Sequence, residues 1–370
     1  MLLLLLLAVL MATSVASHAQ ARATEGYADR MRSLLPATSC HTVASAQGDP
    51  PKEEILWWRD PGTAPTLGRW CAAVGGAVVH AKPAMEHADG EEGIDSVVVV
   101  SWNTHVGGGE LERLVEDLRE GRLTDGQPVR HFVLLLQEAP RAGQPVPEML
   151  PEGARAGRAF HEQPGSRERF YIDRIARDLG LALYYVPSMR NGRLKEDWGN
   201  ALLSTLPLSD FAALELPFES RRRVAAAAAV EGRTTAGVPW RLRLSSAHLD
   251  VWSRRGLLST AGGGRLRQTR ALVDALGQDS TATVLGGDFN TWSPREPSLS
   301  HLRQHFPDSP PGERKRTHAT TGRRLDYLFF RLPECWTARY HRLDDRYGSD
   351  HHPLLGWVRM AGCSAEVEAG

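Results

Sequence analysis

Acidic, imidazole and amide side chains lie at the ends of short apolar runs in this sequence. The carboxylates are Glu138, Asp288, Asp326 and Asp350, the imidazoles are His248 and His351, and the amides are Asn103 and Asn290. Carboxylates are hard oxygen donors of the kind that Mg²⁺ and Mn²⁺ prefer, usually one or two together with water and a substrate phosphate. Imidazoles bond phosphate oxygens or transfer protons. The set fits phosphoester hydrolysis, in which catalysis is mostly positioning and neutralisation of charge.

These side chains sit where strands are expected to end or begin. The runs that end in them are Val97–Ser101 before Trp102-Asn103, Phe132–Leu136 before Gln137-Glu138, Leu242–Ala247 before His248, and Val284-Leu285 before Gly286–Asn290. Asp326 opens an apolar run, and the segment Gly348–Pro353 precedes the last one. Ligands of open α/β sheets bind where the strands end. We therefore expect these residues to converge on one cleft.

The elements that must position them are short β-branched runs alternating with helical patterns from Asp95 onward. The sequence predicts strands at 97–100, 132–136, 181–186, 201–204, 223–230, 240–247, 282–285, 325–330 and 354–359, and helices at 110–120, 167–179 and 265–276. This mixture predicts an α/β or α+β sandwich in one large domain, 95–360, followed by a tail, 361–370. Residues 22–94 are irregular and rich in Pro, so we expect an N-terminal extension that packs against the outside.

The chain opens with an apolar run, Met1–Met11, followed by small residues up to Ala21. This pattern is typical of a secretory signal peptide, 1–21, cleaved near Ala19 or Ala21, and predicts a secreted or periplasmic protein. A wrongly assigned start codon is the alternative. No later run reaches the roughly 18 uncharged apolar residues that a membrane helix needs, so stable membrane insertion is not expected.

Four cysteines in an exported chain predict two disulfides, because such compartments are oxidising. Of the three connectivities, Cys40–Cys71 with Cys335–Cys363 is the most local. No pair has the CxxC spacing of a zinc ribbon or a thioredoxin-like redox site.

The charge balance limits the partners. Lys and Arg number 44, Asp and Glu also 44, so the formal net charge is zero over 370 residues. This argues against nucleic-acid binding through a global positive field and against polybasic membrane binding. Any anion must be bound locally.

Seven motifs occur in a fixed order: Trp102-Asn103, Gln137-Glu138, Gly199–Ser204, Ser246–His248, Gly287–Asn290, Leu325–Tyr327 and Ser349–His351. Together they resemble the endonuclease/exonuclease/phosphatase family, which includes DNase I-like nucleases, abasic-site endonucleases, sphingomyelinases and inositol polyphosphate 5-phosphatases. The resemblance covers about residues 96–360. It implies a DNase I-like four-layer sandwich in which two mainly antiparallel β-sheets are flanked by helices.

The resemblance also implies a role for each residue. Glu138 would bind the metal (Mg²⁺ or Mn²⁺, with Ca²⁺ as a further candidate), assisted by Asn103 and Asp350. Asp288 would orient or deprotonate the attacking water, with Asn290 beside it holding the phosphate. His351 would contact the scissile phosphate, its other ring nitrogen held by Asp326, and His248 would be a second phosphate ligand.

The substrate is left open by these motifs, because nucleases and lipid or inositol phosphatases of this family share them. Basic clusters at 221–223, 265–270, 314–316 and 323–324 either hold several phosphates or are solvated surface charge. Neither a 5-phosphatase signature nor a long hydrophobic docking loop is recognised, so a DNase-like phosphodiesterase acting on DNA is chosen by elimination. The alternatives are a lipid or inositol phosphatase or sphingomyelinase-like enzyme, and a non-catalytic binding protein or toxin subunit, which would be expected to lack some of these acidic or histidine positions.

Overall fold

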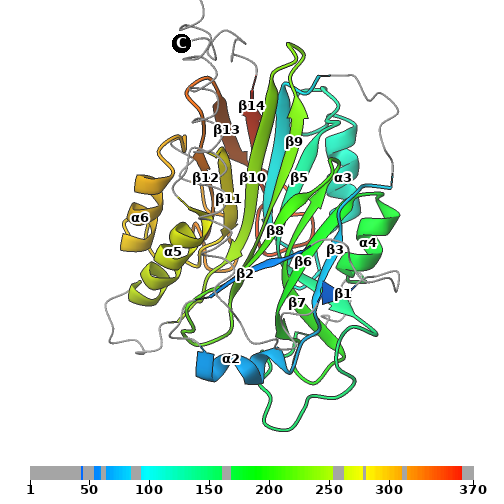
Figure 1. Cartoon of the computed structure of the whole chain (residues 1–370), viewed down its shortest axis with the longest axis vertical. Coiled ribbons are helices and arrows are strands. Elements are labelled where there is room, and N and C mark those ends of the chain that lie inside the picture. Colours follow the sequence, from blue (N-terminus) through cyan, green and yellow to red (C-terminus); the bar gives the residue numbers. More distant parts are fainter. Residues whose placement is uncertain are drawn as a thin grey trace, which may run out of the picture.

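Two β-sheets stacked face to face form the centre of the molecule (Figure 1). The computed structural model describes residues 43–44, 54–59, 64–84, 93–160, 168–252, 262–277, 281–310 and 315–360. In order across the first sheet lie β1 (Val43–Ala44), β3 (Ala77–His80), β6 (Ala182–Arg190), β7 (Glu196–Ser204), β5 (Phe132–Ala142), β4 (Ser96–Asn103), β14 (Leu354–Arg359) and β13 (Thr337–Arg342). In the second lie β12 (Asp326–Arg331), β11 (Thr283–Asp288), β10 (Pro239–His248), β9 (Val224–Arg233), β8 (Ser209–Glu215) and β2 (Leu56–Arg59).

Helices cover the outer faces of both sheets (Figure 1). On the first sheet lie α3 (Leu111–Arg119) and α4 (Ile172–Asp178), and on the second lie α5 (Gly263–Leu276) and α6 (Pro297–His305). The short helix α2 (Ala64–Cys71) lies at one end of the sandwich. In α3 the buried residues Leu111, Leu114, Val115 and Leu118 recur at helical spacing, which gives the helix one apolar face against the sheet. The four-layer sandwich with mainly antiparallel sheets is confirmed.

The core between the sheets depends on strands whose side chains alternate between two apolar environments. In β9 the residues Ala226 and Ala228 face the inter-sheet core, whereas Ala225 and Ala227 face the helices on the other side. Small residues also allow the sheets to approach closely, because a Cβ added at Gly286 would lie 2.8 Å from a side-chain atom of Ser101 in the opposite sheet. The two sheets are therefore closely apposed near the ends of β4 and β11.

Residues before Asp95 contribute more than an outer cover. Strand β2 extends the second sheet beside β8, and β3 pairs with β6 in the first. The part of 22–94 that the structure describes thus supplies edge strands to both sheets, and the expectation that it only packs outside is corrected. Its status as a separate segment stays a prediction, and the predicted signal peptide and C-terminal tail lie outside the described residues. Within the described ranges no helix has the length and apolarity to cross a membrane.

Candidate active site

The ends of five strands bring the predicted residues together. Strands β4 and β5 run parallel with Asn103 opposite Gln137, and β10 and β11 run parallel with His248 opposite Asp288. Strand β12 runs antiparallel to β11 and places Asp326 opposite Asp288. Because parallel strands in register end at the same edge, the polar residue that follows each apolar run reaches one place.

Asp288 lies at the centre of this group and is 2% exposed. Its Oδ2 accepts a hydrogen bond from Asn103 Nδ2 at 3.1 Å and lies 3.5 Å from His248 Nε2 and 3.7 Å from His351 Nε2. Its Oδ1 accepts from the backbone N–H of Asn290 at 2.9 Å. Five residues that the sequence predicted to converge therefore lie within contact of one another around Asp288.

His351 is held by a buried carboxylate. Its Nδ1 lies 2.8 Å from Asp326 Oδ2, and its backbone carbonyl accepts from the indole of Trp102 at 3.1 Å. Burial alone would lower the pKa of His351, but the charges of Asp326 and Asp288 outweigh it and raise the pKa to about 10. The ring is therefore an imidazolium at neutral pH, with Nε2 directed at Asp288.

The other two titrating groups of the centre shift in different directions. Burial, reinforced by the charge of Asp326 and opposed by His351, raises the pKa of Asp288 to about 7. Burial also places the pKa of His248 well below its usual value, with Arg223 and His351 adding to the effect. The site thus combines a carboxylate near the midpoint of its titration, a charged imidazole and a neutral imidazole, which is an arrangement suited to proton transfer.

Glu138 carries backbone strain at the edge of the centre. Its φ is +53°, which a non-glycine residue rarely adopts, and the pairing of β5 with β7 shifts register between Leu136 and Ala139. The side chain is 21% exposed, and its Oε1 is 4.0 Å from His248 Nδ1. Strain of this kind is concentrated at functional sites. A partly exposed carboxylate beside His248, for which the described residues provide no close hydrogen-bond donor, fits a divalent cation that also keeps water ligands.

Asp350, the third predicted metal ligand, has imidazole partners on both oxygens. His105 Nδ1 lies 2.8 Å from Oδ1, and His318 Nε2 lies 3.4 Å from Oδ2. The backbone N–H of Thr321 donates to His318 Nδ1, so the Nε2 of a neutral His318 carries the proton that points to Asp350. These bonds lower the pKa of Asp350 well below its usual value although burial opposes them. Nothing in the sequence singled out His105 or His318.

Asn290 lies in the left-handed region with φ +48°. Its side-chain amide donates to the carbonyl of Leu249 at 3.0 Å, which ties the loop after β11 to the loop after β10. One N–H of the amide is therefore used structurally, and the other remains available for the predicted phosphate contact.

The arginines of the basic clusters differ in their burial and in their contacts. In the cluster 221–223, Arg222 pairs with the buried carboxylate of Glu215 at 3.1 Å. The guanidinium of Arg223 is also buried, and its Nε and Nη1 have no hydrogen-bond partner among the residues that the structure describes. Burial lowers the pKa of Arg223, opposed by the charges of Asp250, Glu138 and Asp288. Arg223 is therefore a buried cation that interacts electrostatically with the carboxylates of the centre, and no sequence pattern distinguished it from its two neighbours.

Two further cluster members bind carboxylates of the chain itself. Arg265 binds Glu296 at 2.8 Å, and Arg267 binds Glu219 at 2.6 Å. Arg267 is partly exposed and agrees with the surface interpretation, whereas Arg265 is buried in an internal ion pair that neither interpretation of the cluster predicted.

The two stacked sheets and the convergence of these strand ends are those of a phosphoesterase. The sequence model of the endonuclease/exonuclease/phosphatase family matches residues 100–351, and the chain belongs to this family, whose members are phosphoester hydrolases. A search of curated proteins finds no match.

Three solved structures are similar to this chain at low sequence identity. An endonuclease/exonuclease/phosphatase from Beutenbergia cavernae is 18% identical, with 72% of each chain covered and a TM-score of 0.47. The human Nocturnin catalytic domain with bound sulfate is 17% identical, covering 72% of this chain and 95% of that one at a TM-score of 0.45. A mannosyl-6-phosphatase from Bacteroides thetaiotaomicron is 12% identical, covering 71% and 99% at a TM-score of 0.43.

Proposed function

We propose that the protein is a divalent-metal-dependent phosphodiesterase of the DNase type. The observation that carries the proposal is the placement of Asp288, whose pKa is raised to about 7, between the neutral ring of His248 and the charged ring of His351. A general base works best when its pKa lies near the working pH. A protonated imidazole opposite that base is suited to a phosphate oxygen that gains negative charge.

In the proposed mechanism Glu138 and Asn103 hold the cation, and Asp350 supports the arrangement through His105 and His318. When bound, the cation supplies Lewis-acid polarisation of the phosphate and neutralises its charge. Asp288 accepts a proton from the water that attacks phosphorus, while the bond to the leaving oxygen breaks in line with the attack. His351 and Arg223 donate hydrogen bonds to the phosphoryl oxygens, and Asp326 holds His351 in its charged form.

The charges of the site do not by themselves distinguish a diester from a monoester. Four carboxylates, Glu138, Asp288, Asp326 and Asp350, stand against the cations of His351 and Arg223. A phosphodiester carries one negative charge, whereas a monoester carries close to two at neutral pH. The proposed divalent cation adds two positive charges to those of His351 and Arg223 and offsets the four carboxylates, so the diester in our proposal comes from the DNase-type resemblance and is tested by the substrate panel.

The substrate class is tested by hydrolysis assays on the purified protein with Mg²⁺, Mn²⁺ or Ca²⁺. The panel contains single- and double-stranded DNA, RNA, sphingomyelin, inositol phosphates and bis-p-nitrophenyl phosphate, each with an EDTA control. Hydrolysis of DNA that EDTA abolishes is the expected result. Preferential hydrolysis of sphingomyelin or of an inositol phosphate would replace the DNase-type proposal with one of the alternatives drawn from the sequence.

Export and the disulfides belong to the same proposal. Cys71 is buried in α2, Cys335 precedes β13, and neither is a free thiol. Cys40 and Cys363 lie outside the described residues, so the pairing Cys40–Cys71 with Cys335–Cys363 stays a prediction. Peptide mapping without reduction tests it, and the N-terminal sequence of the protein recovered outside the cytoplasm tests cleavage near Ala19 or Ala21.

A further inference from the structure

Two exposed tryptophans stand beside the candidate active site. Trp252 is 46% exposed and follows His248 by four residues, and Trp292 is 42% exposed and follows Asn290 by two. Their rings meet edge to face with centroids 5.7 Å apart. Within the described residues the other exposed large hydrophobic side chain is Met149. Exposure of two adjacent indoles is costly in water, which points to a binding role.

A buried polar network fixes the loops that carry both rings. Arg265 donates to the carbonyl of Val251 at 2.8 Å, next to Trp252, and binds Glu296 at 2.8 and 2.9 Å. The carboxylate of Glu296 in turn accepts from the backbone N–H of Trp292 at 2.6 Å. Since Arg265 and Glu296 are 6% and 4% exposed, this network is well shielded from water. The pair of tryptophans is therefore presented on a rigid support, as a preorganised site requires.

A guanidinium lies against one of the two exposed tryptophans. The guanidinium of Arg323 lies 4.4 Å from the ring centroid of Trp292, within the range of a cation–π contact. Aromatic faces together with arginine are the chemistry that binds an unstacked nucleobase and the phosphate next to it.

We propose that Trp252, Trp292 and Arg323 form a stacking site for a nucleobase of the substrate beside the scissile phosphate. The inference rests on the proposed function and narrows it to nucleic acids whose bases are unstacked, that is, single strands or frayed ends. The aromatic rings bind the base, and Arg323 binds the neighbouring phosphate. A membrane surface is the less favoured occupant, because the patch consists of two rings and one cation and not of a broad apolar face.

The test measures the binding of fluorescein-labelled single-stranded oligonucleotides by anisotropy, in the full chain carrying Asp288→Asn to prevent hydrolysis. One probe contains normal bases, and a matched probe has abasic sites in the same backbone. Trp252→Ala and Trp292→Ala are each expected to weaken binding of the normal probe by about 5- to 150-fold, which corresponds to base stacking of roughly 1 to 3 kcal/mol. Binding of the abasic probe is expected to stay nearly unchanged, and Trp292→Phe to recover much of the loss.

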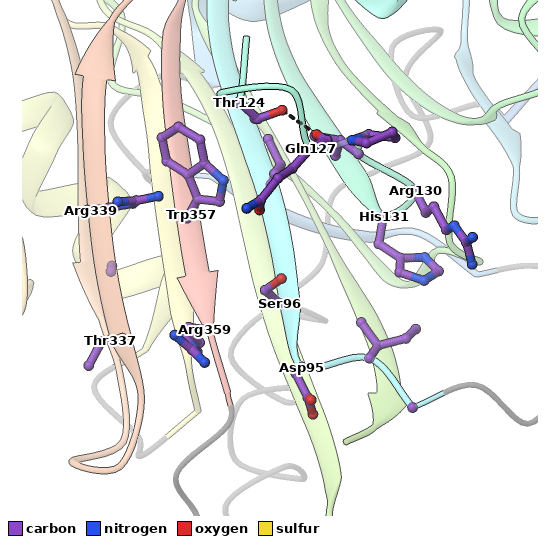
Figure 2. Close-up of a pocket in the computed structure, with 16 residues that line it drawn as sticks. Asp95, Ser96, Thr124, Gln127, Arg130, His131, Thr337, Arg339, Trp357 and Arg359 are labelled. Carbon is purple, nitrogen blue, oxygen red and sulfur yellow. Dashed lines mark hydrogen bonds between the residues drawn. The ribbon is translucent and has the colours of Figure 1, made fainter. Parts of the chain in front are cut away.

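Trp357 provides a matched control. Trp357 lies on β14, and the guanidinium carbon of Arg339 lies 4.6 Å from the centroid of its ring. Both residues line a pocket that also contains Ser96 (Figure 2). Ser96 begins β4, whereas Asn103 ends it at the candidate active site. Trp357→Ala removes a comparable arginine–tryptophan contact and is expected to leave both affinities unchanged.

Three outcomes would decide against the stacking site: unchanged affinity in both tryptophan variants, equal losses on the normal and abasic probes, or loss of binding to sphingomyelin-containing vesicles with oligonucleotide binding intact. If the wild-type chain hydrolyses no phosphodiester but the tryptophan variants lose base-dependent binding, the proposed function fails and the stacking site stands. If DNA is hydrolysed equally well by all variants at low substrate concentration, the proposed function stands and the stacking site fails.

Discussion

Replacing Asp326 by Asn should move the pH range in which the protein is active. The carboxylate of Asp326 lies 2.8 Å from His351 Nδ1, and both side chains are buried. Asn keeps the size of the side chain and an oxygen acceptor but removes the charge. The variant therefore tests the electrostatic role of Asp326 with little change in shape.

The magnitude follows from the pKa of His351. Its rise from 6.5 to about 10 corresponds to roughly 5 kcal/mol in favour of the charged ring, at about 1.4 kcal/mol per pKa unit. The charged form is present below the raised pKa and is lost as the pH rises through about 10. Without Asp326 the largest of the attractions that raise the pKa of His351 is lost while burial continues to lower it, so the pKa falls although Asp288 still raises it. Once this pKa lies below the assay pH, each further unit by which it falls reduces the charged fraction of the ring, and with it the activity, about tenfold.

The low-pH side of the profile should move in the same direction. Asp288 must be ionised, so wild-type activity is lost as the pH falls through about 7. Asp326 raises the pKa of Asp288, and its removal lowers that pKa. The wild-type plateau from about 7 to about 10 should therefore shift towards acid in the variant.

The assay is kcat/KM for a phosphodiester substrate from pH 5 to pH 10.5 at saturating metal. Asp344→Asn, whose side chain is 83% exposed, serves as the control and should leave the profile unchanged. In a His351→Gln background, Asp326→Asn should have no further effect on the high-pH limit, because that effect passes through His351, whereas the low-pH limit set by Asp288 should still move towards acid. An activity loss of the same size at every pH, or a high-pH limit that stays near 10, would refute the electrostatic role of Asp326.

Three further predictions concern metal binding, the effect of the Asp288 charge on stability, and a buried ion pair. Glu138→Gln should lose activity that excess Mn²⁺ or Mg²⁺ partly restores, whereas Asp288→Asn should lose about 10² to 10⁴ in rate with no recovery in the same titration. Asp288→Asn should also raise the melting temperature of the metal-free protein at pH 8. A carboxyl whose pKa is raised to about 7 lowers the stability of the fold once it is ionised, by up to roughly 4 kcal/mol. An unchanged or lower melting temperature would contradict this prediction. Arg222→Met leaves Glu215 buried without its partner and should lower the free energy of unfolding in urea by about 3 to 5 kcal/mol. Arg241→Met removes a half-exposed ion pair and should lower it by about 1 kcal/mol or less. Equal losses in the two variants would contradict the role of burial.

The sequence predicted the central strands well because their patterns are locally determined. Strands β4, β10, β11 and β14 are apolar over most of their length and were located within a few residues. Strand β13 was missed, because at the sheet edge Thr337–Arg342 carries polar side chains on both faces. Strand β5 continues through Pro140 to Ala142, beyond the predicted end at 136, because the chain bulges at Glu138 and then resumes pairing. Helix α4 begins at Ile172, after an extended Tyr171, and not at 167.

The candidate site was predictable where a residue follows a central strand directly. Asn103, His248 and Asp288 meet because parallel partners in register end together. The burial of Arg223 and the contacts of His105 with Asp350 depend on side-chain packing between distant segments. Such contacts have no periodicity or spacing in the sequence, which is why a string of three arginines could not be divided into a structural pair and a site residue before the structure was known.

We propose that Asp288 activates water for metal-dependent hydrolysis of a phosphodiester. One comparison of rates tests this role. Initial rates on a defined single-stranded DNA substrate are measured at pH 8 for the wild-type chain and for Asp288→Asn, with saturating Mg²⁺ and with excess EDTA. We expect hydrolysis by the wild type in Mg²⁺, a rate lower by about 10² to 10⁴ for Asp288→Asn, and no hydrolysis in EDTA. Wild-type rates for Asp288→Asn, or full activity in EDTA, would contradict it.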